Sequence, residues 1–160
     1  MLAPLKDRSV AAVSAGAFVM SHAARNTEIL KEAYRRWNDT KGGSVDHWLS
    51  LLAPKINFGS LAQGRPDALS FTQTRESREG VADYLRELTR DWAMDDYRMD
   101  VFVAELDRVV AIGRCAWRHK TTGKRVDTPK ADVWRFDADG RVVEFFEYYD
   151  TAAVIEGARP

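Results

Sequence analysis

The spacing of apolar residues changes character about halfway along the chain. In the first half, apolar residues recur at intervals of three and four, which is typical of amphipathic helices. Three helices are expected: one from Asn26 or Thr27 to about Asn38, a shorter one that begins at Ser44, and one over residues 79–93. One face of each is expected to be buried.

From residue 97 onward, apolar and polar residues alternate, as in strands with one buried face. Turn residues divide this half into four expected strands: 97–105, 109–119, 125–136 and 141–149. A short strand over 55–61 and a polar connection over 63–77 precede them. Helices first and antiparallel strands afterwards indicate the α+β class, with three N-terminal helices packed against one face of a curved antiparallel sheet.

The last two expected strands carry the sharpest chemical feature of the chain. Asp132 shares a strand face with Trp134, and Glu147 shares one with Phe145 and Tyr149. A carboxyl group among aromatic rings is poorly solvated, and desolvation raises its pKa. Both carboxyl groups are therefore candidate proton donors or acceptors.

Each of these groups also has a purely structural alternative. Asp132 could pair with Lys130, two residues away on the same face, and Glu147 could point outward to an arginine. We interpret Lys130 as a surface lysine at a strand end, with a pocket position as the alternative. Ser60 has no evident histidine partner, so we expect it to orient substrate or water rather than act as a nucleophile.

The expected strand over 109–119 helps to define the inner face of the sheet. Small or apolar residues make up one of its faces: Ala111, Gly113, Cys115 and Trp117. Arg114 and Arg118 lie on the other face, where solvent or a partner is expected. Glycine inside a strand indicates a close backbone approach or a sharp bend at Gly113.

Composition narrows the class of protein. A chain of 160 residues is expected to form one domain and to bury about 70% of its unfolded surface. Lysine plus arginine equals aspartate plus glutamate, at 24 each, and no segment concentrates positive charge, so a nucleic-acid site is not expected. The single cysteine, Cys115, excludes an internal disulfide, and no metal-binding spacing or membrane-spanning run is present. We expect no metal ion, no cofactor and no membrane partner.

The first 25 residues are expected to be an extension to a single domain over residues 26–160. Lys6 and Arg8 precede a mildly apolar stretch and then small residues over 21–24, which is the outline of a secretory signal. Asp7 and the polar residues within the stretch weaken that outline. We expect a cytoplasmic protein, with export as the alternative if residues 1–23 act as a signal peptide.

Three helices followed by a bent sheet that ends in D-x-x-R-F-x-x-x-G-R-V-x-E-x-x-x-Y-Y-D resemble the nuclear transport factor 2-like superfamily. The similarity is best over residues 131–151, is collinear from Tyr34 onward and leaves the first 25 residues uncovered. It implies a cone-shaped, cystatin-like α+β barrel. The superfamily includes ketosteroid isomerases, SnoaL-like polyketide cyclases and limonene-epoxide hydrolases, so the fold alone does not specify the reaction.

The resemblance also implies roles for individual residues. Asp132 occupies the position of the protonated aspartic acid of ketosteroid isomerases and of the acid/base aspartate of SnoaL-like cyclases. Tyr34 occupies that of the isomerases' oxyanion-hole tyrosine. Glu147 matches one aspartate of the epoxide hydrolases' Asp-Arg-Asp set, but Gly113 and Cys115 replace the other two residues. The isomerase general base falls near Ser60, which cannot take a carbon-bound proton unaided, so neither standard activity is expected.

The combined expectation is a small-molecule enzyme that works by acid/base catalysis in an enclosed pocket. The reaction would be of the isomerase, cyclase or hydratase/hydrolase type, on an apolar compound that bears a carbonyl or an epoxide. Asp132, Tyr34 and Glu147 are the expected catalytic residues. The expected substrate-binding residues are Ser60, Phe58, Trp48, Trp117, Trp134, Phe145 and Tyr149. A homodimer through the outer face of the sheet is expected, and the alternative function is a non-catalytic ligand-binding or dimerising module of the same fold.

Overall fold

The computed structural model describes residues 21–64 and 69–160, so most of the predicted N-terminal extension, including the signal-like stretch, lies outside the described residues. Within these residues there are four helices: α1 (His22–Asp39), α2 (Val45–Leu51), α3 (Arg78–Asp91) and α4 (Thr151–Ala158). The described part of the chain also contains six strands: β1 (Leu52–Ser60), β2 (Arg75–Ser77), β3 (Trp92–Glu105), β4 (Arg108–His119), β5 (Arg125–Phe136) and β6 (Val142–Tyr149). A 3-10 turn, η1 (Ser70–Thr72), lies in the predicted polar connection. The α+β prediction is confirmed.

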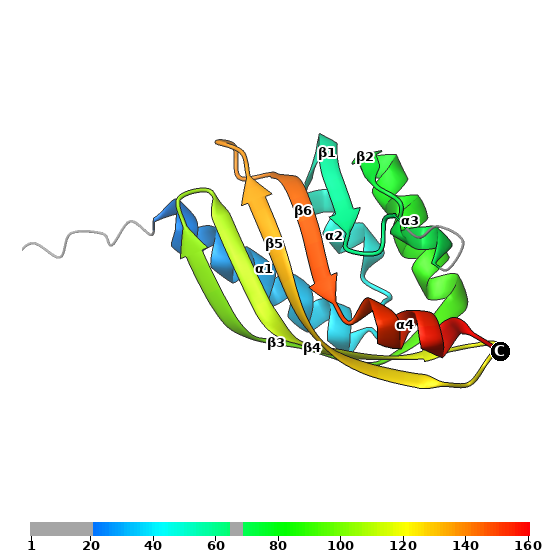
Figure 1. The fold of residues 1–160 in the computed structure, drawn as a ribbon. Coiled ribbons are helices and arrows are strands. Elements are labelled where there is room, and N and C mark those ends of the chain that lie inside the picture. The colour runs from blue at the N-terminus through cyan, green and yellow to red at the C-terminus, as the bar shows by residue number, and fades with distance from the viewer. Residues whose placement is uncertain (1–20, 65–68) are drawn as a thin grey trace, which may run out of the picture.

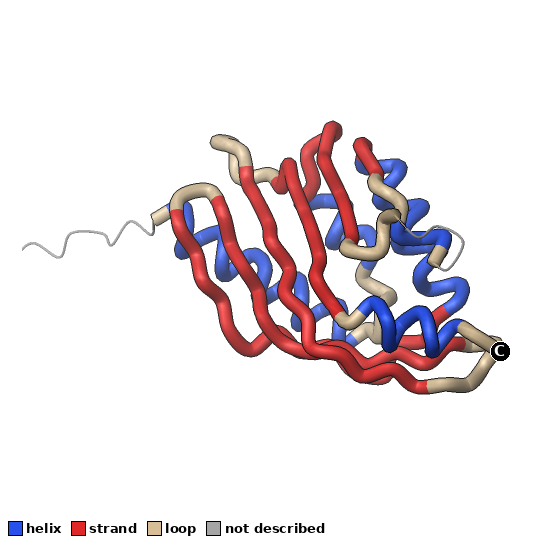
Figure 2. Tube along the Cα trace, viewed as in Figure 1, coloured by secondary structure: helices blue, strands red, loops and turns tan. Residues whose placement is uncertain are grey.

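The strands form one open, curved sheet in the order β2-β1-β6-β5-β4-β3 (Figure 2). Four of the five strand pairings are antiparallel, but β1 runs parallel to β6, with Phe58 opposite Phe145 and Ser60 opposite Glu147. The sheet is therefore mixed rather than purely antiparallel. This pairing matters for the site because it places the end of β1 beside the carboxylate-bearing part of β6.

The first helix begins five or six residues earlier than the sequence pattern predicts. Ser21, not Asn26 or Thr27, is the N-cap, and its side chain accepts a hydrogen bond from the Ala24 amide. The apolar stripe of α1 packs into the core as predicted, with Leu30, Ala33, Tyr34 and Trp37 buried. In Figure 1, α1 lies along the strands β3 to β5, and α3 lies beyond the β2 edge.

At Gly113, the sheet leaves no room for a side chain. It pairs with Met99 on β3, where the register shifts between Met99 and Val101. A Cβ atom at Gly113 would lie 1.9 Å from the Arg98 carbonyl oxygen and 2.7 Å from the Met99 Cα. The close approach that the sequence indicated is therefore present, at an irregularity that bends β3.

The fourth helix was not expected from the sequence. Asp150 caps it by accepting a hydrogen bond from the Ala153 amide, and α4 then packs beside the lower end of the sheet (Figure 1). Gly157 is buried, and a Cβ atom there would lie 2.4 Å from a methyl group of Val126. The small residue thus allows the end of α4 to pack closely against β5.

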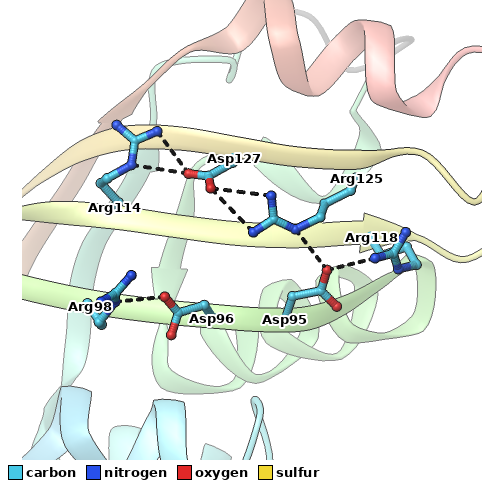
Figure 3. Close-up of polar contacts among 7 residues, drawn as sticks. All are labelled: Asp95, Asp96, Arg98, Arg114, Arg118, Arg125 and Asp127. Atoms are coloured by element: carbon cyan, nitrogen blue, oxygen red, sulfur yellow. Dashed lines mark hydrogen bonds and ion pairs between the residues drawn. The ribbon is translucent and has the colours of Figure 1, made fainter.

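The outer face of β3, β4 and β5 carries a network of ion pairs (Figure 3). Asp127 on β5 pairs with Arg114 at 2.9 Å and with Arg125 at 3.3 Å. Asp95 on β3 pairs with Arg118 at 3.1 Å and with Arg125 at 3.2 Å. The predicted outward orientation of Arg114 and Arg118 is confirmed, and both are bound to acids of their own chain. The homodimer through this face stays a prediction.

None of the helices within residues 21–64 and 69–160 has the length and apolar character that crossing a bilayer requires.

Candidate functional site

A cavity of about 100 Å³ lies between the helices and the inner face of the sheet. Aromatic side chains dominate its lining, and Trp48 and Trp134 stack with ring centroids 5.2 Å apart and nearly parallel planes. The sequence-predicted binding residues that line it are Phe58, Trp48, Trp117, Trp134, Phe145 and Tyr149. A cavity of about 150 Å³ can hold one benzene molecule, so this one, at about 100 Å³, has room for a compact group smaller than benzene.

Asp132 lies at this cavity and is almost completely buried, with 1% of its side chain exposed. Its Oδ2 atom accepts a hydrogen bond from the Tyr34 hydroxyl at 2.6 Å and another from the Tyr97 hydroxyl at 3.2 Å. The Trp134 indole N–H donates to the Tyr34 oxygen at 2.7 Å and so fixes the tyrosine in place. The other carboxyl oxygen, Oδ1, has no hydrogen-bond partner among the described residues. One oxygen of Asp132 is thus held by hydrogen bonds, and the other can still accept or donate one.

Lys130 is buried at the cavity, which corrects its interpretation as a surface lysine. Its side chain is 4% exposed, and its ammonium lies 2.8 Å from Glu147 Oε2 and 3.2 Å from Asp132 Oδ1. It also donates to the Tyr97 hydroxyl at 2.5 Å. The alternation of β5 places Lys130 on the same face as Asp132, and the two carboxylates make burial of an ammonium tolerable. The structural alternative for Asp132, an ion pair with Lys130, is therefore present within the candidate site itself.

Glu147 points inward and does not pair with an outer arginine. Its Oε2 accepts the hydrogen bond from Lys130, and its Oε1 accepts one from the Tyr84 hydroxyl on α3. The predicted catalytic residues Asp132, Tyr34 and Glu147 are thus brought to one cavity, with Lys130 joining the two carboxyl groups. Their catalytic roles stay a prediction.

Ser60 is the exception among the predicted binding residues. It is completely buried and does not line the cavity; its hydroxyl shares a 2.7 Å hydrogen bond with the hydroxyl of Tyr149. Tyr149 therefore stands between Ser60 and the cavity. In this arrangement Ser60 can orient the tyrosine ring but does not contact a ligand directly.

The ionisation of the site follows from burial and from the position of Lys130. Burial raises the pKa of the Asp132 carboxyl above its ordinary value, and the nearby Lys130 ammonium opposes that rise. Burial alone would lower the pKa of Lys130, but the charges of Asp132 and Glu147 outweigh it and hold that pKa well above the usual range. Burial also raises the pKa of Tyr34 and Tyr97, so both hydroxyls remain donors at neutral pH.

Sequence reasoning missed two polar residues of the site, Tyr84 and Tyr97, and gave the pocket position of Lys130 only as the alternative. Tyr84 was placed only in the apolar stripe of the third helix, and Tyr97 stood at the start of an expected strand. The signal for Lys130 was present, because it shares a strand face with Asp132. The tyrosines gave no such signal, because their hydroxyls reach the carboxylates only after helix and sheet are packed together.

Within the part of the chain that the structure describes, no group of three or more His, Cys, Asp or Glu side chains is arranged to hold a metal ion. Cys115 lines the cavity, and burial raises the pKa of its thiol to about 11, so it stays protonated at neutral pH.

Solved structures with the same fold are numerous. An NTF2-like protein from Burkholderia thailandensis is 23% identical over 84% of this chain and 98% of its own, with a TM-score of 0.70. A candidate SnoaL-like polyketide cyclase from Jannaschia sp. CCS1 is 18% identical over 91% of this chain and 99% of its own, with a TM-score of 0.70. A protein of ketosteroid isomerase-like fold from Catenulispora acidiphila, in complex with trimethylamine, is 14% identical over 82% of this chain and 92% of its own, with a TM-score of 0.66.

These likenesses, all below 25% identity, show the NTF2-like α+β cone. No curated protein matches the sequence. Residues 30–145, which include part of α1, all of α2 and α3, Lys130 and Asp132, match the family described as the SnoaL-like domain. The chain therefore belongs to the SnoaL-like domain family.

Proposed function

We propose that this protein is a small-molecule enzyme that works by acid/base catalysis, with Asp132 as the group that transfers the proton. The observation that carries the proposal is the position of Asp132: it is buried at an aromatic cavity, Oδ2 is held by two tyrosines, and Oδ1 makes no hydrogen bond among the described residues, although the Lys130 ammonium lies 3.2 Å away. A buried, neutral carboxylic acid can donate a proton to a carbonyl, enolate or epoxide oxygen, or to the carbon of an enol.

The same surroundings support the ionised form once the proton has left. Tyr34 and Tyr97 continue to donate to Oδ2, and the Lys130 ammonium lies 3.2 Å from Oδ1. Burial thus favours the acid, while the hydrogen bonds and the cation stabilise its conjugate base. A group with opposing influences of this kind can both give and take a proton during one reaction.

A single proton-transferring group narrows the reaction type. Both oxygens of Glu147 accept hydrogen bonds, and Ser60 lies behind Tyr149, so neither is free to activate a water molecule. We therefore favour an isomerase or cyclase over a hydrolase. The substrate would be a carbonyl compound that enolises readily, so that no strong base is needed. The size of the cavity limits the group that reacts to one compact ring or a few atoms.

A second candidate is a ligand-binding module without turnover. The observation in its favour is that no second unoccupied acid or base lines the cavity beside Asp132 among the described residues. In such a module, Asp132 would recognise a polar ligand by hydrogen bonding, and the aromatic walls would supply the remaining affinity.

The proposal is tested with acetylacetone, a small 1,3-diketone whose enol form converts to the ketone by proton transfer from a general acid to carbon. The wild-type protein is expected to accelerate the loss of enol absorbance over the buffer rate. Asp132→Asn is expected to reduce this acceleration by about 100-fold or more, because general acid/base groups contribute about 10²–10⁴-fold. The control is Asp139→Asn, an exposed aspartate in the β5–β6 turn, which should leave the rate unchanged.

Each outcome of this comparison separates the candidates. Full acceleration in a folded Asp132→Asn variant would exclude Asp132 as the proton donor. Binding of acetylacetone by the wild-type protein, seen as a change in tryptophan fluorescence, without acceleration would favour the binding module. Neither binding nor acceleration would exclude small enolisable diketones from the substrates of this cavity.

A pH dependence is also expected from the ionisation of Asp132. Because burial raises its pKa, the neutral acid persists above the pH at which an exposed aspartate ionises. The acceleration of ketonisation per protein molecule should therefore be highest on the acidic side of that raised pKa and fall as the pH rises through it. The measurement is the pH profile of the acceleration after subtraction of the buffer rate; a flat profile would contradict the assignment.

A further inference from the structure

The cluster at the cavity contains three groups that can carry charge: Lys130, Asp132 and Glu147. Their side chains are 4%, 1% and 11% exposed, respectively. With both carboxyl groups ionised, the cluster would carry a net negative charge in a poorly solvated place, which is unfavourable. One proton on one of the two carboxyl groups makes the cluster neutral, and the contacts distinguish which group holds it.

The contacts of Glu147 are those of an ionised carboxylate. Oε2 accepts a hydrogen bond from the Lys130 ammonium at 2.8 Å, and Oε1 accepts one from the Tyr84 hydroxyl. Both oxygens are acceptors, so neither has a natural place for a proton. Glu147 is also the more exposed of the two carboxyl groups, which lowers the cost of keeping its charge.

The contacts of Asp132 leave Oδ1 as the oxygen that can carry a proton. Oδ2 accepts hydrogen bonds from Tyr34 and Tyr97, whereas Oδ1 makes no hydrogen bond. The Lys130 ammonium lies 3.2 Å from Oδ1, yet it directs its hydrogen bonds to Glu147 and Tyr97. The ammonium is thus close enough to stabilise an ionised Asp132 but is already committed to another anion.

We propose that Lys130 is a positioning residue: bound to Glu147 and Tyr97, it fixes Glu147 as the permanent counter-ion of the site and leaves Asp132 as its only exchangeable proton carrier. The use of that proton in catalysis depends on the proposed function, but the distribution of charge does not. Glu147, which the sequence suggested as a second proton-transferring group, becomes the anion that holds Lys130 in place. In its resting state, the cavity then contains the ion pair of Lys130 and Glu147 beside the neutral acid Asp132.

The other titratable groups that face Asp132 support this distribution. These groups are four tyrosine hydroxyls and one thiol, and burial raises the pKa of each, so all stay neutral at neutral pH. They are Tyr34 on α1, Tyr84 on α3, Tyr97 on β3, Cys115 on β4 and Tyr149 on β6. Among the described residues that line the cavity, Lys130 and Glu147 are then the charged neighbours of Asp132.

The test is carbon-13 NMR of the full chain with labelled aspartate and glutamate side chains, which reports the protonation of each carboxyl group without a substrate. In the wild-type protein, Asp132 should be neutral and Glu147 ionised at pH 7. Glu147→Gln should lower the pKa of Asp132 by about one pH unit or more, because Lys130 is left with Asp132 as its only anion. Lys130→Met should raise that pKa by a similar amount, because the cation is lost and a carboxylate remains nearby.

Two further variants separate positioning from a merely structural role. The double variant Lys130→Met/Glu147→Gln removes both charges, and the pKa of Asp132 should return toward its wild-type value. Glu144→Gln is the matched control: it lies on the same strand, but its carboxylate pairs with Arg108 and Arg135 and should leave Asp132 unmoved. A lysine with only a structural role would change stability without producing opposite movements in the two single variants.

The proposal is overturned if the wild-type protein holds its proton on Glu147 at pH 7, or if Glu147→Gln leaves the pKa of Asp132 unchanged. These two measurements suffice even where Lys130→Met does not fold. They are also independent of turnover: a correct charge distribution without acceleration of ketonisation would reject the proposed enzyme and keep this inference. Acceleration of ketonisation by a protein that holds its proton on Glu147 would keep the proposed enzyme and reject this inference.

Discussion

Gly113→Ala is expected to lower the free energy of unfolding by about 3 kcal/mol, because the added methyl group meets backbone rather than a movable side chain. The Cβ atom would lie 1.9 Å from the Arg98 carbonyl oxygen and 2.7 Å from the Met99 Cα. Relief requires β3 and β4 to separate beside the register shift between Met99 and Val101. For a chain of this size, the expected decrease in melting temperature is roughly 10 °C, measured by circular dichroism or calorimetry.

Gly64→Ala is the matched control for this prediction. Among the described residues, no atom lies within 4 Å of a Cβ at Gly64, and its φ lies outside the left-handed region. The added methyl group reduces the flexibility of the unfolded chain in both variants, so the comparison isolates the overlap at β3. Equal melting temperatures for the two variants would show that β3 moves away from β4 at little cost, and that the curvature of the sheet does not depend on Gly113.

The sequence was informative wherever a local pattern decides the structure. The apolar stripe of α1 and the alternation of β4, β5 and β6 are properties of neighbouring residues, and they are present as predicted. The parallel pairing of β1 with β6 is not such a property, because it joins residues about 90 positions apart. Local alternation identifies the faces of a strand but leaves its partner and direction open.

In the candidate site, too, local patterns were predictable and contacts between distant residues were not. Alternation placed Asp132 and Glu147 on strand faces shared with aromatic residues but left an outward Glu147 open. The resemblance added Tyr34, whose hydroxyl does bind Asp132. Lys130 was misjudged because a lysine is rarely buried without a partner, and its two partners come from different strands. The decisive contact, between Lys130 and Glu147, depends on the pairing of β5 with β6 and could not be read from either strand separately.

The α4 helix was missed although its N-terminal signal was present. Asp150 is a favourable N-cap and its side chain accepts from the Ala153 amide, yet the helix that follows is only two turns long. Short helices are marginal by themselves and form where tertiary packing supports them. The support comes from Gly157, which is packed against Val126 of β5.

Lys130→Met is expected to destabilise the protein by about 3–5 kcal/mol at neutral pH, the usual cost of removing one partner from a buried ion pair. Methionine fills much of the same volume, so the loss is electrostatic: Asp132 and Glu147 remain buried without a cation. The exposed Lys31→Met, which loses only a surface pair with Glu28, should change stability by less than about 1 kcal/mol.

The sign of the pH dependence separates this electrostatic cost from a packing defect. A carboxyl group whose pKa is raised on folding, as that of Asp132 is, contributes stability that is complete below about pH 4 and is lost as the pH rises through its folded pKa. Without Lys130, no cation offsets negative charge on Asp132 or Glu147. The folded variant must therefore exceed the unfolded chain in bound protons by more than the wild-type protein does. The stability difference between wild type and Lys130→Met, measured by urea unfolding, should therefore be largest at neutral pH and shrink as the pH falls toward 4. A difference that stays constant over this range would indicate a cavity or a misfit at methionine, and would mean that the ammonium of Lys130 is not what compensates the two buried carboxyl groups.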